Sequence, residues 1–160
     1  MIEKSKRTDV KKKKGNDKTF IASVICFLTV TLLFRTILYL GFVPSTSMSP
    51  TIDKGSIILG LRIFSKDNIT KGDVVVFEHN GEMLVKRVAA TSGDTVTVQN
   101  GIVTVHDSAE SVEDGLTLQD GEFYMLGDNA GASLDSRFWE EPLVNKKDIK
   151  AVVMLPNTER

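Results

Sequence analysis

The chain has 160 residues, of which 41% are hydrophobic and 26% charged, a length that fits one globular domain. Its net charge is -1, but basic and acidic residues are unevenly distributed. Residues 1–19 hold eight Lys or Arg and three Asp or Glu, whereas residues 41–160 hold eleven Lys or Arg and eighteen Asp or Glu. The single cysteine, Cys26, excludes a disulfide within the chain and a cysteine-based metal site, and with only two histidines we expect neither a metal nor another cofactor.

The first 40 residues predict a membrane anchor. Residues 1–18 are rich in lysine and lack apolar periodicity, which is typical of a tail, and Lys and Arg are retained on the cytoplasmic side of a membrane. Residues 19–40 are almost entirely apolar and would span about 33 Å as a helix, enough for a bilayer core. The alternative is a cleaved secretory signal, but the run is too long and no small-x-small site ends it. We expect an uncleaved transmembrane helix with a cytoplasmic N-terminus.

Residues 41–160 predict an extracytoplasmic domain of the mainly β class. Short β-branched stretches alternate with turn signals, and no stretch has the period of a core helix. The dipeptides Asn80-Gly81 and Asn100-Gly101 are those preferred in tight hairpin turns. Residues 107–121 are acidic and irregular, and we expect a surface excursion there. The predicted strands are Ser56–Phe64, Asp73–Glu78, Met83–Thr91, Thr95–Gln99, Ile102–His106, Glu122–Leu126 and Ile149–Leu155.

The segment Pro44–Thr51 (PSTSMSPT) offers a candidate nucleophile, Ser47. Composition alone favours a Ser/Thr/Pro linker, but two prolines also restrain the segment and could hold a short side chain in one pose. Ser47 lies seven residues beyond Leu40, within about 23 Å of the expected helix end even in an extended chain. A serine nucleophile needs a base, so the hypothesis depends on finding one.

The candidate base is Lys86. Strand alternation places Leu84, Lys86 and Val88 on one face, so the lysine stands among apolar neighbours. Burial lowers the pKa of a lysine and lets it accept a proton near neutral pH, whereas Arg87 would stay charged. Taken alone, Lys86 is an ordinary strand lysine, and its interest comes from a pairing with Ser47.

A third cluster, residues 127–137 (GDNAGASLDSR), is rich in turn formers. One interpretation is a structural loop closed by an ion pair between Asp135 and Arg137. The other adds a hydroxyl, from Ser133 or Ser136, that orients a neutral lysine by hydrogen bonding. Spacing alone leaves both open.

These clusters, in this order after one anchor helix, resemble the type I signal peptidases, which are serine-lysine proteases of peptidase family S26. PSTSMSPT is similar to the family's nucleophile segment, and VKRV (residues 85–88) with Gly93-Asp94 is similar to its lysine segment. KGDVVVF (residues 71–77) and GDNAGASLDSR are similar to two further segments. The resemblance covers essentially the whole chain and implies an antiparallel β-sheet, barrel-like catalytic domain at the membrane.

Position by position, the resemblance implies Ser47 as nucleophile and Lys86 as general base. Ser45 and the backbone of Ser47 would form the oxyanion hole, Ser133 would orient the lysine, and Asp135 and Arg137 would support the site. The implied activity is removal of signal peptides from exported preproteins, with cleavage after Ala-x-Ala-like sites. The implied partners are preproteins and the lipid bilayer, with no metal and no nucleic acid. The related self-cleaving repressors would need a DNA-binding domain, and this chain has an anchor instead.

Three positions depart from the family pattern. Ala130 stands where an arginine is usual, residues 90–92 replace a common Gly-Leu-Pro, and Glu140 stands where glycine is usual. They motivate an alternative function, an assembly factor or chaperone for a specialised exported client such as a pilin, with little or no hydrolysis.

Overall fold

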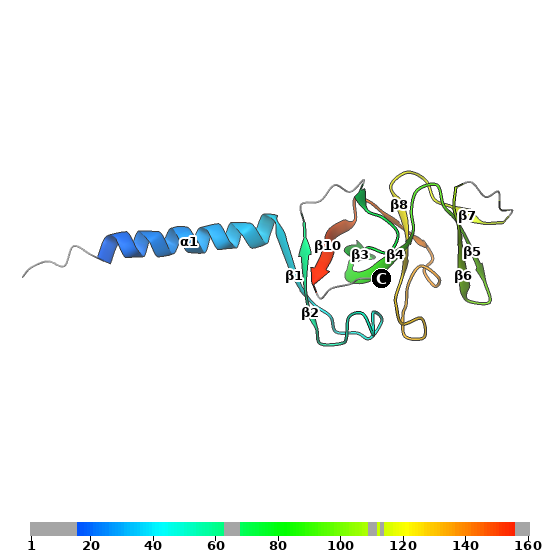
Figure 1. Cartoon of the computed structure of the whole chain (residues 1–160), viewed down its shortest axis with the longest axis horizontal. Helices are drawn as coiled ribbons and strands as arrows, with labels where there is room; N and C mark the ends of the chain where they lie inside the picture. The colour runs from blue at the N-terminus through cyan, green and yellow to red at the C-terminus, as the bar shows by residue number, and fades with distance from the viewer. Residues whose placement is uncertain (1–15, 63–67, 109–111, 113, 156–160) are drawn as a thin grey trace, which may run out of the picture.

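The computed structural model describes residues 16–62, 68–108, 112 and 114–155. The tail expected over residues 1–18 lies almost wholly outside these ranges. One helix is followed by strands that form two antiparallel sheets (Figure 1). The elements are α1 (Asn16–Thr36), β1 (Leu38–Phe42), β2 (Ile57–Leu61), β3 (Val74–His79), β4 (Glu82–Ala90), β5 (Thr95–Gln99), β6 (Ile102–His106), β7 (Leu116–Thr117), β8 (Glu122–Leu126), β9 (Leu143–Asn145) and β10 (Ile149–Leu155). The predicted mainly β class with one N-terminal apolar helix is confirmed.

Helix α1 projects away from the sheets (Figure 1), and its apolar side chains are exposed. By length and composition it can cross a membrane. The hydroxyls of Thr29, Thr31 and Thr36 each donate to the carbonyl four residues earlier, so these polar groups are satisfied within the helix. The helix ends at Thr36, four residues before the expected end, because the chain from Leu38 onward pairs with β2.

The larger sheet has seven strands in the order β1-β2-β10-β3-β4-β8-β9. Its long central pair is the hairpin of β3 and β4, with register from Val74 opposite Arg87 to His79 opposite Glu82. The predicted Asn-Gly turn closes this hairpin, with φ of 50° at Asn80 and 82° at Gly81. Both residue types tolerate positive φ, which is why the dipeptide favours the turn.

β4 changes partners along its length. Its first half, Glu82 to Lys86, pairs only with β3, Arg87 pairs with both β3 and β8, and Val88 and Ala90 pair with β8. The outer edge of the first half therefore lacks a strand neighbour among the described elements. That edge runs alongside the segment that carries Ser47, since residues from both line one cavity.

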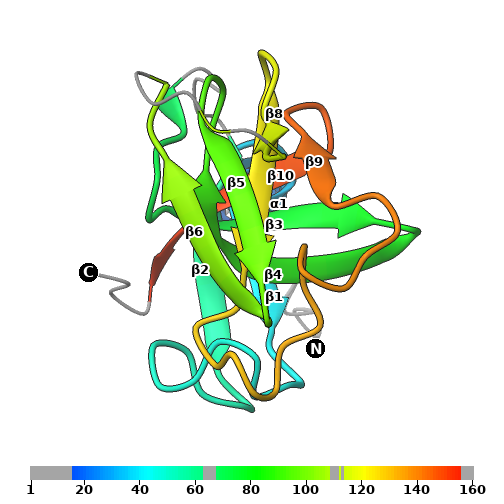
Figure 2. The ribbon, with the colours of Figure 1, turned by 90° about the vertical axis from the view of Figure 1, so that its right-hand side faces the viewer.

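The smaller sheet, in the order β6-β5-β7, lies at the end of the domain remote from α1 (Figures 1 and 2). Its β5–β6 turn is the second predicted Asn-Gly hairpin, with φ of 52° at Asn100 and 76° at Gly101. The region 107–121, expected to be an irregular surface excursion, contains regular and buried structure among the residues that the structure describes there (107, 108, 112 and 114–121). It contributes β7 and a fully buried Leu118, which packs against Tyr124.

The core consists of three apolar clusters. One of them includes Met48 and Ile52, both fully buried, so the candidate nucleophile segment is fixed to the domain rather than lying free as a linker. Burial of each such side chain is worth about 2 kcal/mol. The remaining clusters centre on Phe77 and on Tyr124.

Candidate active site

Ser47 lies in a turn-rich segment between β1 and β2 that hydrogen bonds hold in place. The Ile52 N–H donates to Met48 O at 2.8 Å, and the Ser49 N–H donates to Thr46 O at 3.1 Å. Two donations from Asn129 reach the same segment, from its backbone N–H to Ser47 O at 3.0 Å and from its side-chain amide to Thr46 O at 3.2 Å. The backbone of Ser47 is thus positioned by a loop 82 residues later in the sequence.

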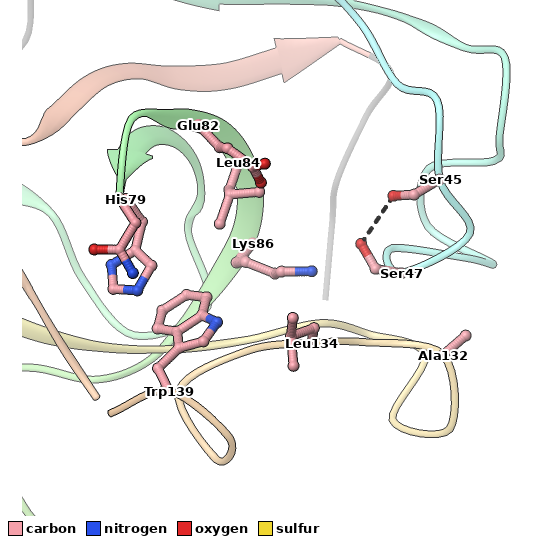
Figure 3. Close-up of a pocket in the computed structure, with 10 residues that line it drawn as sticks. Ser45, Ser47, His79, Glu82, Leu84, Lys86, Ala132, Leu134 and Trp139 are labelled. Atoms are coloured by element: carbon pink, nitrogen blue, oxygen red, sulfur yellow. Dashed lines mark hydrogen bonds between the residues drawn. The ribbon is translucent and has the colours of Figure 1, made fainter. Parts of the chain in front are cut away.

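The side chains of Ser45 and Ser47 face one another. Their hydroxyl oxygens are 3.3 Å apart and hydrogen-bonded, as the dashed line in Figure 3 shows. Ser47 is 7% exposed, whereas Ser45 is exposed. The structure therefore brings together the two serines that sequence predicted for the nucleophile and the oxyanion hole.

Lys86 extends from β4 into the same space (Figure 3). The residue is only 4% exposed, and its Nζ donates to Ser133 Oγ at 3.1 Å. Burial lowers the pKa of Lys86; Asp135 opposes this lowering and Arg137 adds to it. The predicted strand alternation is confirmed, because Leu84 and Lys86 line the cavity while Arg87 points elsewhere.

The loop after β8 supplies the hydroxyl that contacts Lys86, and the structure distinguishes the two serines that sequence left open. Ser133 accepts from Lys86, whereas Ser136 Oγ accepts from the Met125 N–H at 2.9 Å and so attaches the loop to β8. Gly127 leaves the room that this arrangement needs, since a Cβ there would lie 2.2 Å from Ser133 Oγ and 2.6 Å from Ser47 O.

Asp135 and Arg137 form the expected ion pair. Arg137 donates to the two carboxylate oxygens, each at 2.8 Å, and the Gly127 N–H donates to the same carboxylate at 2.9 Å. Burial acts to raise the pKa of Asp135, but the hydrogen bonds from Arg137, Gly127 and Ser133 hold it below its usual value. A buried ionised carboxylate thus lies behind Ser133.

A second ion pair, which the sequence did not indicate, joins the lysine segment VKRV to GDNAGASLDSR, and the same arginine also contacts KGDVVVF. Arg87 donates to both carboxylate oxygens of Asp128, at 2.8 Å and 2.6 Å, and to Gly72 O at 2.7 Å. A bidentate pair of this kind fixes both position and orientation. In the sequence, the arginine next to the candidate base and the aspartate after Gly127 are the only indications of this ion pair. Two residues 41 positions apart form no spacing pattern that predicts a contact.

Ser47 and Lys86 line two adjoining cavities. One, of about 340 Å³, continues toward the β3–β4 turn and is shown in Figure 3; the other, of about 370 Å³, continues toward Phe42 at the end of β1. Both are also lined by Ser45, Glu82 and Leu84. Sequence reasoning missed Glu82 and Trp139 as cavity residues, although alternation along β4 places Glu82 on the face of Lys86.

No group of three or more His, Cys, Asp or Glu side chains in the described part of the chain is arranged to hold a metal ion. The residues around Ser47 offer a hydroxyl nucleophile, an amine of lowered pKa and hydrogen-bond donors beside them. That set suits acyl transfer through a serine.

Comparison with known proteins gives a family match over nearly the whole chain. The model of the family "Signal peptidase, peptidase S26" matches residues 17–113 and 106–157. A probable thylakoidal processing peptidase 2 of Arabidopsis thaliana is 31% identical over 70% of this chain, which spans only 36% of that plant protein's length. Signal peptidase I U of Bacillus subtilis is 27% identical over 82% of this chain and 83% of its own. A Staphylococcus aureus relative, 23% identical over 81% of this chain and 85% of its own, is named an inactive signal peptidase IA.

Proposed function

This chain belongs to the signal peptidase family, peptidase S26, and we propose that it is a membrane-anchored serine endopeptidase that removes signal peptides from exported preproteins. The observation that carries the proposal is the meeting of Ser47 with a buried Lys86 of lowered pKa in one cavity. A lysine poised to lose its proton beside a serine is what activation of the hydroxyl requires.

The first half of the reaction is formation of an acyl-enzyme. Neutral Lys86 removes the proton from Ser47 Oγ as the oxygen attacks the carbonyl carbon of the scissile bond. The carbonyl oxygen becomes an oxyanion, which the Ser45 hydroxyl and the Ser47 backbone N–H stabilise by donating hydrogen bonds. Collapse breaks the C–N bond, and the Lys86 ammonium gives its proton to the leaving amine.

The second half regenerates the enzyme. Lys86, neutral again, takes a proton from water, and the resulting oxygen attacks the acyl carbon. Collapse releases the signal peptide with a new carboxyl end, and the lysine returns the proton to Ser47 Oγ. In this cycle Ser47 must exchange its contact with Ser45 for one with Lys86.

The substrate is an extended peptide. The outer edge of β4 from Glu82 to Lys86, which has no strand neighbour among the described residues, and the segment 42–45 form the two walls of the cavity near Phe42. An extended chain between them can use the free backbone groups of β4 as a neighbouring strand does. The lining is mostly apolar (Phe42, Val43, Pro44, Met83, Leu84 and Val85), and we propose that it receives the small side chains of small-x-small cleavage sites.

The membrane arrangement follows from charge and connectivity. Helix α1 has the length of a transmembrane span, and the lysine-rich residues before it favour a cytoplasmic N-terminus. We accordingly place the tail of residues 1–18 in the cytoplasm and residues 41–160 outside it. The bilayer is then a partner. The apolar segment of the preprotein lies in the same membrane as α1, so the preprotein reaches Ser47 from the membrane side.

Cleavage by the purified full chain in detergent micelles tests the proposal. A preprotein with an Ala-x-Ala site should be cut after the second alanine, and Ser47→Ala or Lys86→Ala should each lower kcat/KM at least about 10⁴-fold, because the pair acts as a unit. Ser49→Ala is the matched control, since its hydroxyl contacts Asp53 instead of the dyad. Full activity in either dyad variant would contradict the mechanism.

The second candidate, an assembly factor that holds an exported client without hydrolysis, is favoured by the relatives named inactive in Staphylococcus aureus. This chain keeps both Ser47 and Lys86. If Ser47→Ala fully restored client assembly to cells that lack the chain, the binding function would replace the catalytic one.

A further inference from the structure

Leu134 lies between two anchored residues of the loop after β8, and its own side chain is exposed, at 67%. On one side of it, Ser133 accepts a hydrogen bond from Lys86 at 3.1 Å. On the other side, Asp135 is fully buried and paired with Arg137. The backbone at Leu134 is therefore held from both directions, and a residue presented by a fixed backbone loses little conformational freedom when it binds a ligand.

The exposed leucine is part of an apolar wall of the cavity shown in Figure 3. The same wall contains Ala132 from the same loop and Trp139 from the segment before β9. The indole is fixed in place, because the His79 ring stacks on it with centroids 4.0 Å apart and Phe77 meets it edge-on at 6.0 Å. Phe77 is fully buried, so the wall is attached to the core of the domain.

This wall belongs to one of the two cavities that meet at Ser47. Ala132, Leu134 and Trp139 line the cavity of Figure 3, and none of these three described residues lines the cavity near Phe42. The proposed reaction places the peptide before the scissile bond in the cavity near Phe42, against the outer edge of β4. The chain beyond the scissile bond then continues from Ser47 into the cavity of Figure 3.

The proton transfers of the proposed reaction place the leaving amine beside the same loop. Lys86 must give a proton to this nitrogen as the C–N bond breaks, so the nitrogen has to come within hydrogen-bond reach of Lys86 Nζ. That Nζ is 3.1 Å from Ser133 Oγ, and both chain neighbours of Ser133, Ala132 and Leu134, line the cavity. The substrate residue that carries the leaving nitrogen is thus the one that comes closest to Leu134.

We propose that Leu134 receives the side chain of the first residue after the scissile bond and favours an apolar residue there. This inference rests on the proposed function. An apolar side chain against Leu134 and Trp139 removes surface of both partners from water, which a glycine cannot do and an aspartate does only with a loss of hydration. We expect a preference of about ten-fold for leucine over glycine, the lower end of the range for hydrophobic contacts, because Leu134 borders open solvent.

The first test compares peptides that are identical except for Leu, Gly or Asp directly after an Ala-x-Ala site. For the full chain in micelles, kcat/KM should fall about ten-fold from Leu to Gly and further from Gly to Asp. Leu134→Ala should reduce the ratio of Leu to Gly to about two-fold, and Leu134→Met should keep it. The same three residues at x, before the scissile bond, should give ratios that Leu134→Ala leaves unchanged.

Phe138→Ala is the matched control. Phe138 lies on the same loop, is 59% exposed and lines neither cavity. Its replacement removes a comparable apolar side chain, so the ratio of Leu to Gly should stay at that of the unaltered chain. Loss of the ratio in both variants would assign it to the loop as a whole and overturn the role of Leu134.

A thiol at position 134 tests the placement without hydrolysis. The single cysteine is removed by Cys26→Ser, and Leu134→Cys is combined with Ser47→Ala so that the peptide stays uncut. The probe is a peptide whose one cysteine is activated as a thiopyridyl disulfide, and attack by the new thiol joins the two sulfurs and releases thiopyridone. The reaction should be at least about ten-fold faster when the peptide cysteine directly follows the Ala-x-Ala site than when it stands at x.

Two results would overturn the inference and leave the peptidase intact. One is an unchanged ratio of Leu to Gly in Leu134→Ala, and the other is a thiol reaction that is equal or faster from x. Failure of the unaltered chain to cut any of the peptides would instead contradict the proposed function, and the inference with it.

Discussion

Lys86 Nζ donates to Ser133 Oγ at 3.1 Å, and this contact joins β4 to the loop after β8. Both residues are nearly inaccessible, at 4% and 6% exposure. The amine is thus held by a hydroxyl that itself lies against the buried Asp135. The dependence of the proposed reaction on this arrangement can be measured in several ways.

The pH profile should report the protonation of Lys86. Burial lowers its pKa below the ordinary 10.5, and only the neutral amine acts as a base, so kcat/KM should rise with pH through the lowered pKa and then level off. Steady-state cleavage of an Ala-x-Ala peptide from pH 6 to pH 10 measures it. Lys86→Arg should be inactive throughout, because a guanidinium keeps its proton. Appreciable activity of that variant would exclude Lys86 as the base.

Removal of the Ser133 hydroxyl should slow the chemical step. Ser133→Ala leaves Lys86 without its acceptor, and we expect kcat to fall about 100-fold with KM little changed, since positioning of a general base contributes about that much. Ser136→Ala provides the comparison: its hydroxyl accepts from the Met125 N–H, so it should lose about 1 kcal/mol of folding free energy and keep its kcat. Equal kinetic effects of the two substitutions would reduce Ser133 to a structural role.

Ser45 should matter to rate more than to binding. Ser45→Ala removes a donor proposed for the oxyanion, and loss of one such donor lowers kcat about 10²- to 10³-fold. Ser45→Thr should recover part of the rate because it keeps the hydroxyl. The exposed Thr46 contributes only its carbonyl to the contacts above, so Thr46→Ala should behave as the unaltered chain. A change in KM alone for Ser45→Ala would place the residue in substrate binding.

Gly127→Ala should disable the site by crowding it. The added methyl would lie 2.2 Å from Ser133 Oγ and 2.6 Å from Ser47 O, so the loop or the nucleophile segment must shift. Overpacking of this kind costs about 1–3 kcal/mol. Thermal unfolding and peptide cleavage should both show the loss. Gly131→Ala in the same loop has its nearest neighbour at 4.0 Å and should change neither quantity.

Acid should weaken the fold partly through Asp135. Because its pKa is depressed in the folded chain, the group stabilises the fold above its unfolded pKa, and that stability is lost as pH falls through the folded pKa. Asp135→Asn should cost about 3 kcal/mol at pH 7, since Arg137 loses its partner, and should flatten the dependence of stability on pH below 4. Urea titration at several pH values measures both effects. Asp107→Asn, which alters an exposed pair with Lys71, should change little.

Much of the fold was readable from local signals. The two Asn-Gly turns and the β-branched stretches around them predicted their hairpins, and strand alternation placed Lys86 beside Leu84. β1 was missed because Leu38–Phe42 continues an apolar run that reads as helix, and only pairing with β2 makes it a strand. β9 has three residues, too few for a periodic pattern.

The candidate site, like the fold, was predicted only in part from the sequence. Motifs nominated Ser45, Ser47, Lys86 and Ser133; the structure places the first three around one cavity, and Ser133 accepts a hydrogen bond from Lys86. The clamp between Arg87 and Asp128 and the stack of His79 on Trp139 were not predicted, because each joins residues more than 40 positions apart. Their existence depends on sheet order, which no local pattern encodes.

A single residue, Ile37, separates the end of α1 from the start of β1. Hydrogen bonds cross this junction, from the Ile37 N–H to Leu33 O at 2.9 Å and from the Arg62 N–H to Ile37 O at 2.7 Å. This short, hydrogen-bonded connection holds the domain close to the end of α1. If α1 is fixed in a bilayer, we expect Ser47 to lie at a fixed height above the membrane, and the proposed reaction would then favour preproteins whose cleavage site lies at a set distance from the end of their own apolar segment.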